Sequence, residues 1–153
     1  MFFETFLAGI LGTALMTLGM YTLASITSDH FKVVKVLGTM LTGQTTPEGG
    51  LSDTTSAIAT GIIAHYLVGV GFSFAYTWIW QERLLDMSFA GATLMGFVNG
   101  LIGAAGWRIF FAIHPRPPIM PLSKYLLAIA LGHILFGQGI FATHLFFKEG
   151  ITT

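Results

Sequence analysis

Residues 126–147 read LLAIALGHILFGQGIFATHLFF and contain no Asp, Glu, Lys or Arg. Three further stretches have the same character and cover residues 6–26, 57–80 and 89–113. Arg108 is the only Asp, Glu, Lys or Arg within any of the four. A helix needs about 20 apolar residues to cross the ~30 Å hydrocarbon core of a bilayer. Because each stretch reaches that length, the sequence predicts four transmembrane helices.

The composition of the whole chain supports this interpretation. Of its 153 residues, 54% are hydrophobic and only 9% are charged, whereas soluble domains carry about 25% charged residues. A surface this apolar requires a covering of lipid. The four stretches leave no room for a second folded unit, so we expect one integral membrane domain over residues 1–153. The first stretch lacks a preceding basic residue and is longer than a signal-peptide core, so we expect a true span.

The charges bear on topology and exclude several classes of partner. Net charge is zero, which gives no electrostatic basis for nucleic-acid binding. No cysteine is present, so disulfides and thiolate metal sites are excluded.

Four alternating spans place residues 27–56 and 114–125 on one side of the membrane, and Arg83 and Lys148 on the other. The side with more basic residues is normally cytoplasmic. We therefore predict a bacterial inner-membrane protein with both termini outside and these two connections in the cytoplasm. We mark the basic residues of the cytoplasmic side as candidates for binding anionic lipid headgroups: Lys32, Lys35, Arg108, Arg116 and Lys124.

The connections differ in character. Residues 30–42 mix apolar side chains with Lys32 and Lys35 at helical spacing, which predicts either a short interfacial helix or a connecting helix packed on the bundle. Residues 43–55 are polar and Gly-rich, which is typical of a flexible loop. Prolines crowd residues 115–121 and predict a rigid, extended turn. The short connection at 81–88 predicts that the second and third spans are antiparallel neighbours.

The chain also contains an internal similarity. GTALM at 12–16 corresponds to GATLM at 91–95, and HYLVGVG at 65–71 corresponds to HILFGQG at 133–139. A duplicated two-helix unit would place a pseudo-twofold axis along the membrane normal; chance similarity between apolar helices is the alternative. We expect an all-α, four-helix transmembrane bundle in either case.

GTALMT at 12–17, AHYLVGVGFSFAY at 64–76 and LGHILFGQGI at 131–140 resemble a group of small bacterial inner-membrane proteins of unknown function with four predicted spans. The resemblance covers most of the chain and implies a four-span prokaryotic membrane protein. It implies no activity and no site residues. The polar insertion before the second span departs from the group.

Polar residues inside the spans are the candidates for function. His65 and His133 occupy equivalent positions of the repeat at similar depth, and two facing imidazoles can ligate a b-type haem. The alternative is that each imidazole is neutral and bonds a backbone carbonyl or a hydroxyl, such as that of Thr13, Thr17 or Tyr66. His30, His114 and His144 are expected near the interfaces. We expect Asn99 and Gln138 to hydrogen-bond each other, because an unpaired amide in hydrocarbon costs several kcal/mol.

The predicted spans contain no carboxylate, no Ser-His-acid set and no HExxH motif, which argues against an enzyme and against an ion-coupled transporter. Glycines are abundant in every span and indicate close helix packing, or room for a flat ligand. The leading hypothesis is a non-catalytic accessory subunit of a membrane complex or a homo-oligomer, with bound lipid as a further possibility and no cofactor. The alternatives are a b-haem electron carrier or quinone-linked cytochrome using His65 and His133, and a small dimeric transporter or channel.

Overall fold

The computed structural model describes residues 1–27 and 31–150, and over those ranges it is helical without any strand. Four helices are long and apolar enough to cross a membrane, which makes the chain an integral membrane protein. The four predicted spans are confirmed. The long helix at Phe89–Ile113 matches its predicted stretch, and the other three extend beyond theirs at both ends. The helices are α1 (Phe2–Thr27), α2 (Val33–Thr42), α3 (Thr55–Gln81), α4 (Phe89–Ile113) and α5 (Leu122–Gly150).

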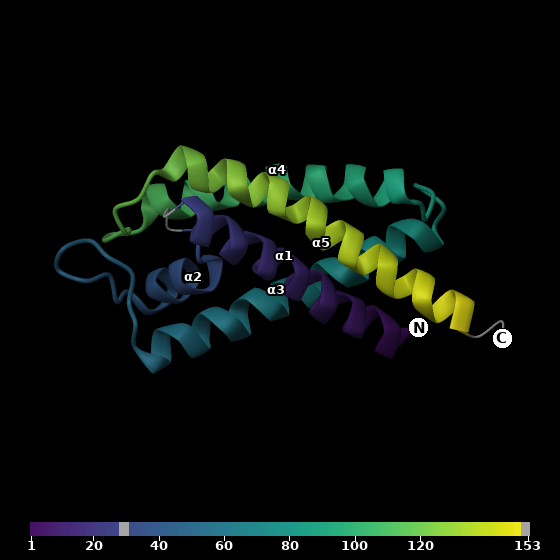
Figure 1. The fold of residues 1–153 in the computed structure, drawn as a ribbon, viewed down its shortest axis with the longest axis horizontal. Helices are drawn as coiled ribbons and strands as arrows, with labels where there is room; N and C mark the ends of the chain where they lie inside the picture. Colours follow the sequence, from purple (N-terminus) through teal and green to yellow (C-terminus); the bar gives the residue numbers. More distant parts are fainter. Residues whose placement is uncertain (28–30, 151–153) are drawn as a thin grey trace.

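The long helices run up and down along the long axis of the molecule (Figure 1). Both termini lie at one end, together with the α3–α4 connection. The α2–α3 and α4–α5 connections lie at the opposite end. This arrangement is the predicted up-down-up-down order. Thr54 precedes α3 and Ser88 precedes α4. The side-chain hydroxyl of each accepts a hydrogen bond from a backbone N–H in the first turn of its helix, as N-cap residues do.

The packing order differs from the chain order. α5 packs against both α1 and α4, α1 also packs against α3, and α3 packs against α2. α3 and α4 do not pack closely, although they follow each other in the chain. They run antiparallel as predicted, but they are not the closely packed neighbours that the short connection suggested. The predicted pseudo-twofold relation would pair α3 with α4 as α1 pairs with α5, and the packing lacks that symmetry.

Glycines form the closely packed interfaces. A Cβ atom placed on Gly96 of α4 would lie 2.5 Å from the His133 carbonyl oxygen of α5, and one on Gly139 of α5 would lie 2.7 Å from the Gly12 Cα atom of α1. Neither position tolerates a side chain without moving a backbone. Small residues let helices approach closely where lipid provides no hydrophobic drive. The expectation of close helix contact is thus met inside the bundle.

The helix expected at residues 30–42 is α2, which packs along α3 (Figure 1). A side chain on Gly38 would collide with the Ala57 carbonyl, and one on Gly61 would collide with that of Val34, so the two helices run antiparallel. Phe31 and Val36 are almost fully buried beside this contact. Of the two alternatives, the structure has the helix packed on the bundle. His30 lies outside the described residues. Gly43 ends α2 with a positive φ of 66°, a conformation that glycine adopts freely.

The two loops at the end away from the termini bind each other. The Thr45 hydroxyl donates to the Arg116 carbonyl at 2.6 Å, and the Ile119 N–H donates to the Gly49 carbonyl at 2.8 Å. His114 Nε2 lies 2.9 Å from the Met40 carbonyl oxygen. The expected rigid proline turn therefore anchors the polar loop, which sequence composition alone described as flexible.

We expect Asp53 to titrate below the ordinary carboxyl pKa of 3.8. Lys35 lowers the pKa of Asp53, first by hydrogen bonding to the carboxylate and second by its charge. Because the folded-state pKa is depressed, the contact stabilises the fold above the unfolded pKa and is lost as pH falls through the folded pKa. Carboxyl NMR titration in micelles should show the Asp53 midpoint rising in Lys35→Ala. The matched Lys32→Ala variant should shift it less, since Lys32 acts only through its charge; equal shifts would contradict the pairing.

Candidate functional site

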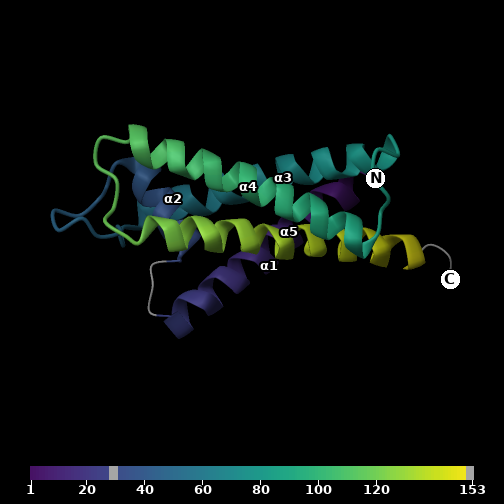
Figure 2. The ribbon, with the colours of Figure 1, turned by 90° about the horizontal axis from the view of Figure 1, so that it is seen from above.

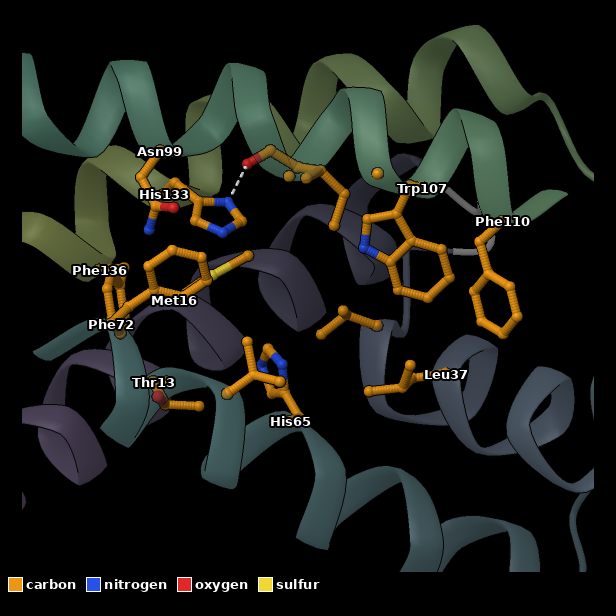
Figure 3. Close-up of a pocket in the computed structure, with 16 residues that line it drawn as sticks. Thr13, Met16, Leu37, His65, Phe72, Asn99, Trp107, Phe110, His133 and Phe136 are labelled. Carbon is orange, nitrogen blue, oxygen red and sulfur yellow. Dashed lines mark hydrogen bonds between the residues drawn. The ribbon is translucent and has the colours of Figure 1, made fainter. Parts of the chain in front are cut away.

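A cavity of about 260 Å³ lies in the middle of the bundle and is lined by residues from all five helices (Figure 3). Its wall is mostly aliphatic and aromatic. None of the sixteen lining residues is Asp, Glu, Lys or Arg. A few polar groups in a largely apolar pocket are typical of a small-molecule site. Here those groups belong to Thr13, His65, Asn99, Trp107 and His133.

The cavity reaches the outer surface between α3 and α4. Val68 of α3 lines it and is 55% exposed. Gly106 of α4 also lines it, is exposed, and has no neighbour within 4 Å of a Cβ position. This is the gap left because α3 and α4 do not pack closely. In a bilayer, the opening faces the acyl chains.

His65 comes from α3, and its hydrogen bond fixes the proton of the neutral imidazole. Its Nε2 atom lies 3.1 Å from the Thr17 hydroxyl of α1. That hydroxyl donates its own proton to the Thr13 carbonyl at 2.7 Å. The Thr17 oxygen must therefore accept from His65 Nε2–H. In the neutral ring, Nδ1 is then an unprotonated acceptor.

His133 comes from α5 and is fixed in the complementary tautomer. Its Nδ1 atom lies 2.8 Å from the Ile129 carbonyl oxygen, which can only accept. Nδ1 therefore carries the proton and Nε2 is unprotonated. A Cβ on Gly103 would lie 3.3 Å from that Nε2 atom. Glycine at this position lets α4 pass close to the imidazole.

Asn99 supplies the least satisfied polar group of the cavity. Its side chain is 4% exposed, and neither the amide nitrogen nor the amide oxygen has a hydrogen-bond partner. It faces the Tyr76 hydroxyl, with an interaction too loose to count as a hydrogen bond. An unsatisfied buried amide costs about 1–3 kcal/mol. Because no protein group offsets this cost by pairing with the Asn99 amide, the amide points to a ligand that pairs with it.

The predicted hydrogen bond between Asn99 and Gln138 is wrong. Gln138 instead donates through Nε2 to the Phe89 carbonyl at 3.0 Å and to the Thr93 hydroxyl at 2.7 Å. Both partners lie in the first turns of α4. Similar depth along two helices does not fix their rotation, and the rotation here directs Gln138 away from Asn99.

Ligation of haem by the histidine pair stays a prediction, but the structure does bring the two side chains together. His65 and His133 enter one cavity from α3 and α5 (Figure 3). Each also makes the hydrogen bond that the alternative proposed, His65 with Thr17 and His133 with a carbonyl. Each imidazole keeps one nitrogen free for another partner.

The five basic residues proposed for lipid binding have different environments. Lys35 pairs with Asp53, and Arg116 Nη2 lies 3.4 Å from the Thr45 carbonyl oxygen in the contact between the loops. Lys32, Arg108 and Lys124 are exposed. Arg108 also borders a surface hollow of about 430 Å³ near the proline turn. Lipid binding by these residues stays a prediction.

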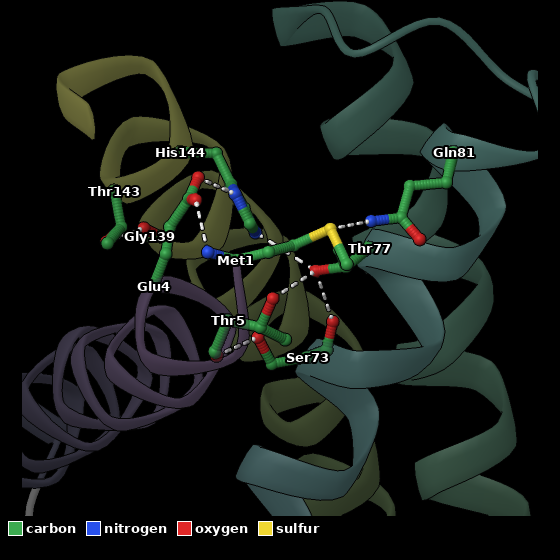
Figure 4. Close-up of polar contacts among 9 residues, drawn as sticks. All are labelled: Met1, Glu4, Thr5, Ser73, Thr77, Gln81, Gly139, Thr143 and His144. Atoms are coloured by element: carbon green, nitrogen blue, oxygen red, sulfur yellow. Dashed lines mark hydrogen bonds and ion pairs between the residues drawn. The ribbon is translucent and has the colours of Figure 1, made fainter. Parts of the chain in front are cut away.

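A second polar cluster joins α1, α3 and α5 near the chain termini (Figure 4). The Glu4 carboxylate lies 2.6 Å from His144 Nδ1, and His144 Nε2 lies 3.1 Å from the Thr77 hydroxyl. Thr5 contacts that hydroxyl at 3.2 Å, and Ser73 donates to the Thr5 carbonyl at 2.7 Å. His144 is 6% exposed, so it is buried between these helices near one end of the bundle.

Sequence reasoning missed this cluster because it began the first span at residue 6. α1 begins at Phe2, so Glu4 is a carboxylate within a span. The order of acid, histidine and hydroxyl is that of a hydrolytic triad. However, the Thr77 hydroxyl is buried and lies 3.0 Å from the Ser73 carbonyl as donor. The hydroxyl is thus held inside the bundle, and the cluster is a clamp between three helices.

We expect His144→Leu and Glu4→Gln each to lower the free energy of unfolding by about 2 kcal/mol, the scale of a hydrogen bond to a charged group. The double variant should lose less than the sum, because both changes break one contact. Thermal unfolding in detergent measures the effect. Glu82→Gln, an exposed carboxylate at the same end, is the matched control and should be neutral. Full additivity of the two changes would exclude the clamp.

No protein-family model, curated protein or solved structure matches this chain. The resemblance to small bacterial inner-membrane proteins therefore stays a prediction. The geometry of the central cavity carries the functional argument.

Proposed function

We propose that this integral membrane protein is a non-catalytic binding protein that holds an uncharged lipophilic molecule in the cavity between α3 and α4. The observation that carries the proposal is the buried, unpartnered Asn99 amide in an otherwise apolar cavity. A cavity of ~150 Å³ already accepts benzene, and this one is larger at about 260 Å³. The opening beside Val68 and Gly106 gives a lipid-soluble molecule a path from the bilayer.

The alternative of an accessory subunit rested on glycine-rich faces. Most of the span glycines lie within the bundle, where a Cβ would meet a neighbouring helix. Gly71 and Gly106 are the span glycines with open space around them. Gly106 belongs to the cavity mouth. These two positions offer less surface for a partner than the sequence suggested, so ligand binding is the better-supported function.

Ligand binding is tested by extracting the full chain from native membranes into polymer discs and identifying co-purified small molecules by mass spectrometry. We expect one uncharged lipophilic species to be enriched over bulk lipid. Gly106→Phe should remove the enrichment by blocking the mouth. Gly71→Phe, which faces open space on α3, is the matched control and should retain it. Equal lipid content in both variants would contradict the proposal.

The facing histidines favour haem b as a second candidate ligand. The free nitrogens are Nδ1 of His65 and Nε2 of His133, and either type of nitrogen can ligate a metal. A porphyrin is several times larger than the benzene ring that ~150 Å³ accommodates, so haem binding requires α3 and α4 to move apart. If the chain binds haem b, the protein purified after haem-supplemented expression should show a Soret band, and His65→Ala or His133→Ala should abolish that band. A protein without the band would exclude this candidate.

A further inference from the structure

We infer that the lipophilic ligand carries a phenolic head group, whose hydroxyl donates a hydrogen bond to an unprotonated imidazole nitrogen of the cavity. The inference rests on the proposed ligand-binding function and adds the chemical class of the ligand. Four features of the cavity support it: the tautomers of its two histidines, the free amide of Asn99, the aromatic wall and the lack of charge.

The histidine tautomers require a ligand that donates. His65 Nε2–H is used by Thr17, and His133 Nδ1–H is used by the Ile129 carbonyl. The remaining nitrogens, Nδ1 of His65 and Nε2 of His133, can only accept in the neutral rings. A hydrocarbon, an ether or a ketone offers them nothing. A hydroxyl pairs with either one.

The Asn99 amide can bond the same hydroxyl group of the ligand. Its amide has free donors on Nδ2 and a free acceptor at Oδ1. A phenolic oxygen that donates to an imidazole can still accept from the Asn99 nitrogen. One hydroxyl therefore satisfies polar groups of two helices, α4 and either α3 or α5. A site built to bond a hydroxyl rejects the analogue that lacks it, because its own polar groups are left unpaired.

The wall selects the shape. Phe72, Trp107 and Phe136 surround the space near the histidines (Figure 3). Aromatic rings stack or meet edge to face with one another, so a flat ring suits these neighbours. The volume of about 260 Å³ holds a substituted ring with a few carbons. A longer tail leaves between Val68 and Gly106 into the acyl chains.

The lining excludes charged ligands. It contains no Asp, Glu, Lys or Arg among its sixteen residues. Burial of an unpaired carboxylate or phosphate in such a site is very costly. Fatty acids and phospholipid headgroups are therefore poor ligands, and a neutral phenol avoids this cost.

The test uses three probes that differ at one position: 4-hexylphenol, its methyl ether 4-hexylanisole, and hexylbenzene. Binding to the purified full chain in detergent is measured by isothermal titration. We expect the phenol to bind at least ten-fold more tightly than the ether or the hydrocarbon. The double variant H65F/H133F keeps flat rings in the wall and should bind the phenol and the ether equally, because the oxygen of either probe can still accept from Asn99. The single variants then assign the histidine that accepts.

The outcomes separate this inference from the function beneath it. If wild-type protein binds the three probes equally, the phenolic class is wrong and ligand binding stands. If the double variant keeps the preference for the phenol over the ether, the hydrogen bond to an imidazole is wrong. If no probe binds and Gly106→Phe changes nothing, both fail. Gly71→Phe is the control for folding and should bind as wild type does. Should H65F/H133F fail to fold, the single variants H65F and H133F replace it, and one of them should lose the preference for the phenol over the ether.

Discussion

Replacement of Gly61 by alanine is expected to lower the free energy of unfolding by about 3 kcal/mol, the upper range for overpacking a tight interface. A Cβ atom at this position would collide with the Val34 carbonyl of α2 and crowd the Gly38 backbone nitrogen at 3.0 Å. Both obstacles are backbone atoms of a buried helix, so no side chain can rotate away. The chain can accept the methyl group only by separating α2 from α3.

Gly71→Ala is the matched control on the same helix. A Cβ atom there meets nothing within 4 Å. Alanine is favoured over glycine in a helix by about 1 kcal/mol, so this variant should be as stable as wild type or more so. Denaturant titration in mixed micelles, followed by circular dichroism, measures both. If the two variants behaved alike, the close contact between α2 and α3 would be wrong.

Asn99→Leu should raise the free energy of unfolding and at the same time weaken ligand binding. Leucine removes an amide whose nitrogen and oxygen are both buried without partners, and the cost of such a group is about 1–3 kcal/mol. We therefore expect the ligand-free variant to be more stable than wild type by up to that amount. At the same time, it should lose affinity for a ligand that bonds the amide. Thermal unfolding and titration of the same preparation measure the two effects.

Gln138→Leu is the matched control for Asn99→Leu. Gln138 is also an amide in a span, but its nitrogen donates to Phe89 and Thr93 of α4. Its replacement breaks two hydrogen bonds and should destabilise the bundle by about 1–2 kcal/mol without changing ligand binding. A destabilised Asn99→Leu variant would show that the Asn99 amide has a structural partner.

The sequence predicted the parts of this structure that depend on hydrophobic length and local chemistry. The four spans, the position of the short helix and the rigid proline turn follow from apolar run length, spacing and proline content. His65 and His133 were identified as the central pair, and they do share a cavity. These features need no knowledge of how one helix is rotated against another.

The remaining features depend on rotation and helix order, which run length does not determine. Asn99 and Gln138 have suitable depths, yet they face different neighbours. α3 and α4 are joined by a short loop, yet the close glycine contacts of α4, such as Gly96 with His133, are made with α5 and not with α3. The Glu4–His144 contact joins opposite ends of the chain and depends on where α1 begins. In a polar–apolar pattern as uniform as this one, few residues mark which face turns inward.

The central place of α5 has a consequence for biosynthesis. α4 packs closely only against α5, and α5 is also a main neighbour of α1. The ribosome makes α5 after α4, so α4 enters the bilayer before its partner exists. We expect α1, α2 and α3 to assemble first, and α4 to remain unpacked until α5 emerges and packs against both α1 and α4. Nascent chains that stop short of residue 122 should therefore expose α4 to insertion chaperones and proteases, whatever the quality of the first three helices.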